Sequence, residues 1–236
     1  MNCRLCKSKS FFKFLDLDYH PPSDQFRKKD QIHLPTTYYP LQVQKCNECH
    51  FFQLTHVVDP KILYQEDYPY ESSTTDTGKL HYNDFAESVI KDFRIVKDSL
   101  VIDIGSNVGV LLEGFKKKGM KVVGVDPAKN IVEIANRRDI FTINSFFDME
   151  ISKKIKDEYG KAKVITGTNV FAHIDNLESF MLAVDNLIDH EKGIFIIEAP
   201  YVLNLFENLE YDTIYHEHLS YISVNPLIKF FKKFNM

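Results

Sequence analysis

The sequence predicts an α/β fold in which a Rossmann-like parallel sheet follows a small cysteine-containing module. From residue 99 onward, short apolar runs alternate with segments of helical periodicity, which is typical of parallel strands joined by right-handed crossovers. Before residue 50 the apolar runs are short, and two Cys-x-x-Cys pairs stand among them. We therefore expect a module over residues 1–57, a connector and helix over 58–97, and a sheet domain over 98–236.

The composition excludes several classes of protein. The chain has 236 residues, of which 44% are hydrophobic, and this is enough for a sizeable buried core. Its net charge is −4 and it has no basic block, so a nucleic-acid partner is not expected. No apolar stretch approaches the roughly 20 residues that span a bilayer, and the first residues lack a signal peptide. We expect a soluble, cytoplasmic monomer without a membrane partner.

Four cysteines form the two pairs, Cys3 with Cys6 and Cys46 with Cys49. Two intervening residues place both sulfurs of a pair on one tight turn, and two pairs supply the four thiolates of a tetrahedral structural zinc site. Two disulfides are the alternative, which a cytosolic setting disfavours. The loop between the pairs is longer than the usual spacing of about 15–20 residues. With sulfur in all four positions no site remains for substrate, so we expect zinc to hold the module together.

Tyrosines are concentrated in the connector over residues 64–73. The following segment, residues 81–96, carries apolar side chains at helical spacing. In the sheet domain, we expect strands over 100–104, 121–126, 142–144, 163–168 and 193–198. The expected helices start at residue 110 and cover 131–138 and 177–188. This order predicts a parallel sheet.

A glycine turn closes the first strand and opens the first helix: Asp103-Ile104-Gly105-Ser106-Asn107-Val108-Gly109. Glycines there let the backbone approach a ligand closely. The second strand ends at Asp126, where a carboxylate can accept both ribose hydroxyls of an adenine nucleoside. The spacing is G-x-x-x-G rather than G-x-G-x-x-G, which favours S-adenosylmethionine (AdoMet) over a dinucleotide because no pyrophosphate has to be seated.

The expected cofactor-binding residues lie at strand ends. Those of the first two strands are Asp103, Gly105, Ser106, Asn107, Gly109, Asp126 and Pro127. After the fourth strand, Asn169, Val170 and His173 are expected to border the cofactor, the alternative for His173 being an ordinary histidine at a helix entry. After the third strand, Phe147 or Phe146 is expected to flank the adenine, with core packing as the alternative.

The densest group of acid–base side chains is Tyr215-His216-Glu217-His218, shortly after the fifth strand. Proton transfer at neutral pH needs groups of this kind held together. Open α/β sheets bind ligands beyond the carboxyl ends of their strands. The segment therefore predicts a catalytic site, the alternative being a polar loop whose histidines bond the backbone.

Several motifs resemble those of the sugar C-methyltransferases of antibiotic and surface-polysaccharide pathways. The resemblance covers nearly the whole chain and rests on both Cys-x-x-Cys pairs and on residues 104–107, 169–173, 198–201 and 211–218. In that family a zinc-binding module precedes a class I methyltransferase domain. AdoMet there methylates carbon three of a 4-keto deoxysugar carried on a nucleoside diphosphate, usually dTDP. The resemblance implies the same fold, cofactors and nucleotide-sugar substrate for this chain.

The resemblance also implies roles for the catalytic segment. Carbon is a poor nucleophile until a proton next to a ketone is removed, and His218 would be the base, since histidine ordinarily titrates near neutral pH. Tyr215 and Glu217 would orient the base, assist proton transfer or hold the sugar, with His216 in the same segment. A tyrosine or histidine that donates to the enolate oxygen is expected, because such a bond is worth roughly 3–4 kcal/mol.

Tyr70 and Ser72, in the connector, also match the family and would close over the methionine end of AdoMet. The chain departs from the family pattern at Val108, where many relatives have an acidic residue. The family also continues into a further α/β domain that helps hold the nucleotide-sugar, whereas this chain ends at Met236, so that domain is expected to be missing.

Three other functions remain open at this point. The first is methyl transfer to an oxygen or nitrogen of a sugar. The second is a binding module that retains AdoMet without turnover. The third is a metal-dependent hydrolase built on His216 and His218.

Overall fold

The computed structural model describes residues 1–64, 68–72 and 74–236. Gln65, Glu66, Asp67 and Ser73 of the predicted connector lie outside the described residues. The chain divides into two compact units. Unit 1 comprises Met1–Leu63, Phe171–Glu178 and Ala199–Met236, and unit 2 comprises Tyr64–Val170 and Ser179–Glu198.

Unit 2 contains a five-stranded parallel sheet in the order β6-β5-β4-β7-β8. Its strands are β4 (Leu100–Ile104), β5 (Lys121–Asp126), β6 (Thr142–Asn144), β7 (Val164–Thr168) and β8 (Ile194–Glu198). All five predicted strands are present, two of them one residue shorter than predicted. Every residue of β4 is buried, Asp103 included, as expected for a largely apolar strand at the centre of a parallel sheet.

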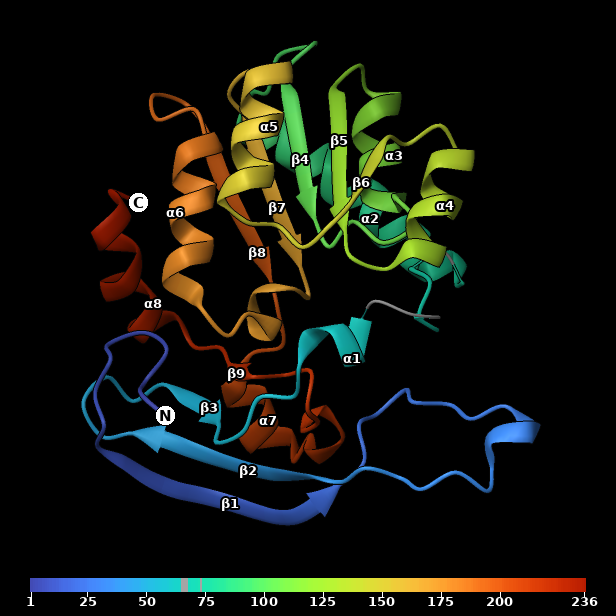
Figure 1. Cartoon of the computed structure of the whole chain (residues 1–236). Helices are drawn as coiled ribbons and strands as arrows, with labels where there is room; N and C mark the ends of the chain where they lie inside the picture. Colours follow the sequence, from blue (N-terminus) through green and yellow to red (C-terminus); the bar gives the residue numbers. More distant parts are fainter. Residues whose placement is uncertain (65–67, 73) are drawn as a thin grey trace. The chain divides into compact units, whose positions relative to one another are not determined.

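Helices cover both faces of this sheet, α2 and α3 on one side and α5 and α6 on the other (Figure 1). The helices from the connector onward are α1 (Pro60–Tyr64), α2 (Asp76–Asp92), α3 (Val110–Lys117), α4 (Lys129–Arg137), α5 (Met149–Tyr159) and α6 (Leu177–Leu187). Helix α2 starts where the Thr75 side chain accepts a hydrogen bond from the Gly78 amide, and Asp148 caps α5 in the same way. Helix α5 was not predicted from the sequence.

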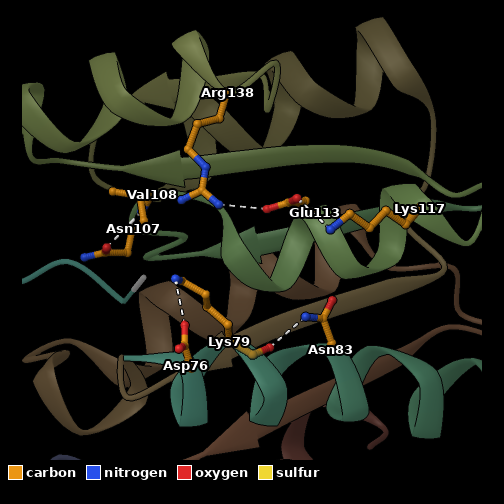
Figure 2. A network of polar contacts seen from close by, with 8 residues as sticks. All are labelled: Asp76, Lys79, Asn83, Asn107, Val108, Glu113, Lys117 and Arg138. Carbon is orange, nitrogen blue, oxygen red and sulfur yellow. Dashed lines mark hydrogen bonds and ion pairs between the residues drawn. The ribbon is translucent and has the colours of Figure 1, made fainter. Parts of the chain in front are cut away.

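The core of unit 2 holds α3 in place and with it the glycine turn that precedes this helix. Leu111, Leu112 and Phe115 of α3 are buried against α2 and the sheet. On the outer side, Glu113 accepts from Lys117 and from Arg138, both at 2.7 Å (Figure 2). These ion pairs are partly exposed and contribute little stability, so the apolar packing fixes the helix.

Unit 1 is built on a four-stranded antiparallel sheet in the order β1-β2-β3-β9. Its strands are β1 (Phe11–His20), β2 (Tyr39–Cys46), β3 (Phe52–Leu54) and β9 (Ser220–Tyr221). Two helices, α7 (Val202–Asn208) and α8 (Val224–Phe231), belong to the same unit. Leu54, Leu205 and Leu219 are among the residues of its apolar core.

These units do not coincide with the three consecutive segments expected from the sequence. Strand β9 adds to the edge of β3, where Gln53 pairs with Ser220, so the final part of the chain folds with the cysteine module. A two-residue strand such as β9 is too short to show a periodicity in the sequence, so a division into consecutive segments could not include its pairing with β3. No helix in the described part of the chain is long and apolar enough to cross a membrane.

Candidate functional site

The glycine turn of unit 2 has the backbone conformation that its sequence predicts. Gly105, Asn107 and Gly109 have φ values of 68°, 49° and 80°, in the left-handed region that glycine and asparagine tolerate best. A Cβ at Gly105 would collide with Val170, and one at Gly109 would lie 2.7 Å from Ile140 Cγ2. Both glycines are therefore required by the packing as well as by φ.

Asn107 joins this turn to the connector. Its Oδ1 accepts from the Ser72 amide at 2.9 Å, and its Nδ2 donates to the Tyr70 carbonyl at 3.0 Å. The same Oδ1 accepts from the amide of Val108, the next residue in the turn (Figure 2). The predicted connector residues Tyr70 and Ser72 thus lie against the predicted turn, held through one side chain.

Two buried acids stand at the ends of neighbouring strands. Asp126 accepts from the amides of Asn107 and Ala128, both at 2.9 Å, and burial raises its pKa. Burial also raises the pKa of Asp103 to about 7, although Thr166 donates to its carboxylate at 2.7 Å. Desolvation disfavours the charged form of both acids, so a cationic ligand would stabilise it.

The other predicted cofactor residues have mixed surroundings. The hydroxyl of Ser106 is buried and has no hydrogen-bond partner among the described residues. The carbonyl of Pro127 accepts from Asn144, and the amide of Asn169 donates to the Glu198 carbonyl at 2.7 Å. Phe147 packs edge-to-face on Phe180 at 5.7 Å, so core packing accounts for at least part of its role.

Four polar residues of unit 2 were missed by the sequence reasoning. His81 Nε2 lies 2.9 Å from Glu198 Oε2, which joins α2 to the end of β8. The hydroxyl of Tyr82 is bonded to Thr168, and burial raises the pKa of Tyr82 to about 12. Both His81 and Tyr82 lie within the predicted helix, where their spacing gave no sign that they face strand ends.

These residues fit AdoMet, which carries a cationic sulfonium and an ammonium group. Two desolvated acids lie at or next to the turn, together with the buried Ser106 hydroxyl, which has no hydrogen-bond partner in the part of the chain that the structure describes. Charge and hydrogen-bonding capacity both match such a ligand.

The four cysteines of unit 1 form two knuckles with the same hydrogen bonds. In the first, the Lys7 amide donates to the Cys3 carbonyl at 3.0 Å, and in the second His50 donates to Cys46 at 3.0 Å. Lys7 and His50 both adopt positive φ, 64° and 62°. Both pairs therefore sit on the tight turns expected of Cys-x-x-Cys zinc ligands.

The sulfur atoms of Cys3, Cys6, Cys46 and Cys49 lie within 4.8 Å of one another. The shortest separations are 3.5 Å for Cys3–Cys49 and 3.6 Å for Cys6–Cys46, close to the edge of about 3.8 Å in a zinc tetrathiolate. All four thiols are free, so this structure does not contain the two disulfides that were the alternative to zinc. The hydrogen bond from Cys49 lowers the pKa of Cys3 to about 5, whereas burial raises that of Cys6. Zinc binds cysteine as the thiolate, so a bound zinc ion would offset the raised pKa of Cys6.

The predicted catalytic segment, residues 215–218, also belongs to unit 1. His218 Nδ1 lies 2.7 Å from the Thr213 carbonyl, and its Nε2 lies 2.9 Å from the Tyr215 hydroxyl. Since a carbonyl can only accept, Nδ1 carries the proton and Nε2 presents its lone pair to Tyr215. Burial lowers the pKa of His218. The neutral imidazole therefore predominates near neutral pH, with its basic nitrogen facing a hydroxyl.

His173, predicted beside the cofactor, lies in unit 1 with its ring 5.2 Å from that of His218. Burial lowers the pKa of His173 to about 3, so it is neutral. His216 is buried and its Nε2 bonds the Tyr39 carbonyl at 3.2 Å. This is the backbone-bonded arrangement that formed the alternative for the histidines, and it gives His216 a structural position. Glu217 is 3% exposed.

A small pocket in unit 1 adjoins the catalytic segment. Its walls are mostly apolar and include Val202 and Leu205, together with His218. Ser220 and Tyr221 also line it, and their buried hydroxyls have no hydrogen-bond partner among the described residues. Burial raises the pKa of Tyr221, so its hydroxyl remains a donor.

The parallel sheet, the glycine turn and the acid at the end of β5 define a class I methyltransferase fold. A family model described as "Methyltransferase domain" matches residues 81–236, and another described as "Putative zinc binding domain" matches residues 3–64. The chain therefore belongs to the methyltransferase-domain family. This confirms the predicted fold and the predicted methyltransferase family, and with the cysteine cluster it supports AdoMet and structural zinc as the cofactors.

Individual proteins are also similar to this chain. C-methyltransferase NovU of Streptomyces niveus is 31% identical over 230 residues, which cover 98% of this chain and 54% of NovU. Ubiquinone biosynthesis O-methyltransferase of Pelagibacter ubique (strain HTCC1062) is 27% identical over 119 residues, covering 47% of this chain and 48% of that protein. The chain thus spans about half the length of the curated relatives it matches.

Solved structures share the fold. The plantazolicin methyltransferase BpumL, solved in complex with SAH, superposes with a TM-score of 0.51 and 16% identity over 65% of this chain and 62% of BpumL. At this identity the likeness concerns the fold alone.

Proposed function

We propose that this chain is an AdoMet-dependent C-methyltransferase that methylates carbon three of a nucleotide-linked 4-keto deoxysugar, with dTDP as the nucleotide. The observation that carries the proposal is the His218 imidazole, whose proton is held on Nδ1 by Thr213 and whose Nε2 faces Tyr215. Such a pair suits removal of a proton from carbon, a step that methyl transfer to oxygen does not need. The match to NovU, named a C-methyltransferase, supports carbon as the acceptor.

In the proposed reaction, the proton next to the ketone moves to the Tyr215–His218 pair. The Tyr215 oxygen takes the proton as its own proton passes to His218 Nε2, which becomes imidazolium and keeps its bond to Thr213. The C–H electrons form the enolate, and the enolate carbon then bonds the methyl group as the S–CH3 bond breaks.

The enolate oxygen needs a donor, and the pocket beside His218 offers two. The Tyr221 and Ser220 hydroxyls are buried and unpartnered within the described residues, so neither has to give up a hydrogen bond in order to donate to the enolate oxygen. A preorganised donor of this kind typically contributes roughly 3–4 kcal/mol to the transition state.

Bound AdoMet supplies an electrophilic methyl group. On the sheet unit, we propose that Asp126 accepts the ribose hydroxyls through its remaining lone pairs, as predicted from the sequence. Asp103 would compensate the cationic charge of AdoMet, and Asn107, which bonds the backbone of Tyr70 and Ser72, would hold these two residues beside the methionine end. Gly105, Ser106, Gly109, Pro127, Asn169 and Val170 shape the backbone around it.

Zinc held by the four cysteines would stabilise unit 1 and take no part in proton transfer, because all its positions are filled by sulfur. The cysteines are the only metal-binding group of this kind found among the described residues, so the hydrolase alternative gains no support. The cytoplasmic location and monomeric state stay predictions.

The test is single-turnover transfer from methyl-labelled AdoMet to a panel of dTDP-4-keto-6-deoxysugars, with His218→Ala beside the parent chain. We expect a product methylated on carbon, and no product from the variant although it still binds AdoMet. A methyl group on oxygen or nitrogen would contradict the proposal in favour of the sugar O- or N-methyltransferase. AdoMet binding without transfer to any sugar would favour the module without turnover.

A further inference from the structure

Arg4 stands inside the first Cys-x-x-Cys knuckle, and its side chain is only 2% exposed. A guanidinium group is costly to bury unless charges and hydrogen-bond acceptors surround it. Arg4 has such partners, all of them within unit 1. The segments to which these partners belong suggest a role for this buried cation.

Two of the acceptors are backbone carbonyls beside the catalytic segment. Arg4 Nη1 donates to the Leu219 carbonyl at 3.1 Å and to the Leu54 carbonyl at 3.3 Å. Leu219 directly follows His218, and its carbonyl also accepts from the Leu54 amide at 2.9 Å. The guanidinium thus donates both to β3 and to the residue that follows the proposed base.

A third acceptor lies near the second histidine. Arg4 Nε donates to Asp175 Oδ1 at 3.2 Å, and Asp175 is two residues beyond His173. The rings of His173 and His218 are in contact at 5.2 Å. One planar guanidinium is therefore bonded to the chain after each of the two neighbouring histidines, whose rings are tilted by 34° to one another, and its fork geometry fixes both directions at once.

The backbone of Arg4 is anchored as well. Its amide donates to Gln53 Oε1 at 2.9 Å, and Gln53 is the fully buried residue of β3 that pairs with Ser220. The neighbouring Cys3 and Cys6 place the Arg4 backbone in the knuckle. Arg4 cannot shift without moving the knuckle, β3 or the histidine-bearing chain.

We propose that Arg4 is a positioning residue that holds His218 and His173 in register with the zinc knuckle. The catalytic part of this inference rests on the proposed function. It assigns the cysteine module a role beyond stability, namely to orient the base, and it predicts that loss of the guanidinium misplaces His218 while the metal stays bound.

The test compares Arg4→Lys with Lys7→Met in the zinc-loaded full chain. Lysine keeps the charge but lacks the fork, so it cannot serve all three acceptors. Lys7 is a matched control, since it is a cation of the same knuckle whose ion pair with Glu178 is half-exposed on both sides. Zinc content, AdoMet affinity and the imidazole ¹⁵N shifts of His218, assigned with His218→Gln, are measured for each.

We expect Arg4→Lys to keep one zinc per chain and its AdoMet affinity, yet to shift the His218 nitrogens and lower kcat by about 10- to 100-fold. Lys7→Met should match the parent in every readout. Parent-like His218 shifts in zinc-loaded Arg4→Lys would overturn the proposal. Because the shifts need no substrate, they decide the role of Arg4 even where the parent transfers no methyl group.

Asp175→Asn keeps the inference testable should Arg4→Lys fail to fold. The Asp175 side chain is 59% exposed, so the fold tolerates its replacement, and asparagine removes only the charge that faces Arg4. We expect a smaller change of the His218 nitrogen shifts in this variant. Shifts identical to the parent would overturn the proposal.

Discussion

The hydroxyl oxygen of Tyr215 lies 2.9 Å from Nε2 of His218. Because the opposite nitrogen of the same ring is bonded to the Thr213 carbonyl, the lone pair of the base is directed at this hydroxyl. In the proposed reaction, a proton reaching the histidine therefore passes through Tyr215. The sequence predicted both residues in one catalytic segment, and the hydrogen bonds of the structure are what suggest the order of the proposed relay.

The acid limb of the pH–rate profile should lie below the ordinary pKa of histidine. Burial lowers the pKa of His218 from its ordinary value of 6.5, so the neutral base persists below that pH. We expect kcat, measured at saturating AdoMet so that protonation of Asp103 does not limit binding of the methyl donor, to have its acid midpoint below pH 6.5, because protonation of His218 removes the base. A pH profile with its acid midpoint above 6.5 would contradict this.

Tyr221→Phe should slow methyl transfer without weakening AdoMet binding. The Tyr221 hydroxyl is buried and lines the pocket beside His218, where it is proposed to donate to the enolate oxygen. We expect kcat to fall about 100- to 1,000-fold, the usual loss for one oxyanion donor. Tyr211→Phe is the control, because Tyr211 is 53% exposed. Equal rates for the two variants would remove Tyr221 from the mechanism.

Asn107→Gly should weaken AdoMet binding by about tenfold, or about 1.4 kcal/mol. Glycine tolerates the positive φ of this position but removes the side chain that holds Ser72 and Tyr70. Calorimetric titration measures the affinity. Asn83→Ala serves as the control, since the Asn83 amide donates to the Lys79 carbonyl within α2 (Figure 2). Unchanged affinity in Asn107→Gly would show that the connector does not close the site.

Cys46→Ser should lose zinc and destabilise unit 1. Cys46 is fully buried at the end of β2, and structural zinc contributes directly to the folding free energy. We expect elemental analysis to give one zinc per parent chain and none in the variant, whose thermal unfolding begins at a lower temperature. Lys45→Gln, one residue earlier on the strand, is the control. A full zinc content in Cys46→Ser would contradict the four-cysteine site.

The parallel sheet could be predicted because most of its strands are largely apolar runs bounded by turns, as in Leu100–Ile104. The metal site could be predicted because Cys-x-x-Cys spacing is set by local turn geometry. The proposed roles of Arg4, Ser220 and Tyr221 could not be predicted. They depend on the pairing of β3 with β9, and these two strands are far apart in the chain. His216 illustrates the same limit, since its bond to the Tyr39 carbonyl arises only when β2 is in place.

The measurement that tests the central claim most directly is solvent deuterium exchange at carbon three of a dTDP-4-keto-6-deoxysugar, with S-adenosylhomocysteine in place of the methyl donor. We predict exchange catalysed by the parent chain and lost in both Tyr215→Phe and His218→Ala. Methyl transfer by the parent without any exchange at a ring carbon would contradict proton removal by this pair.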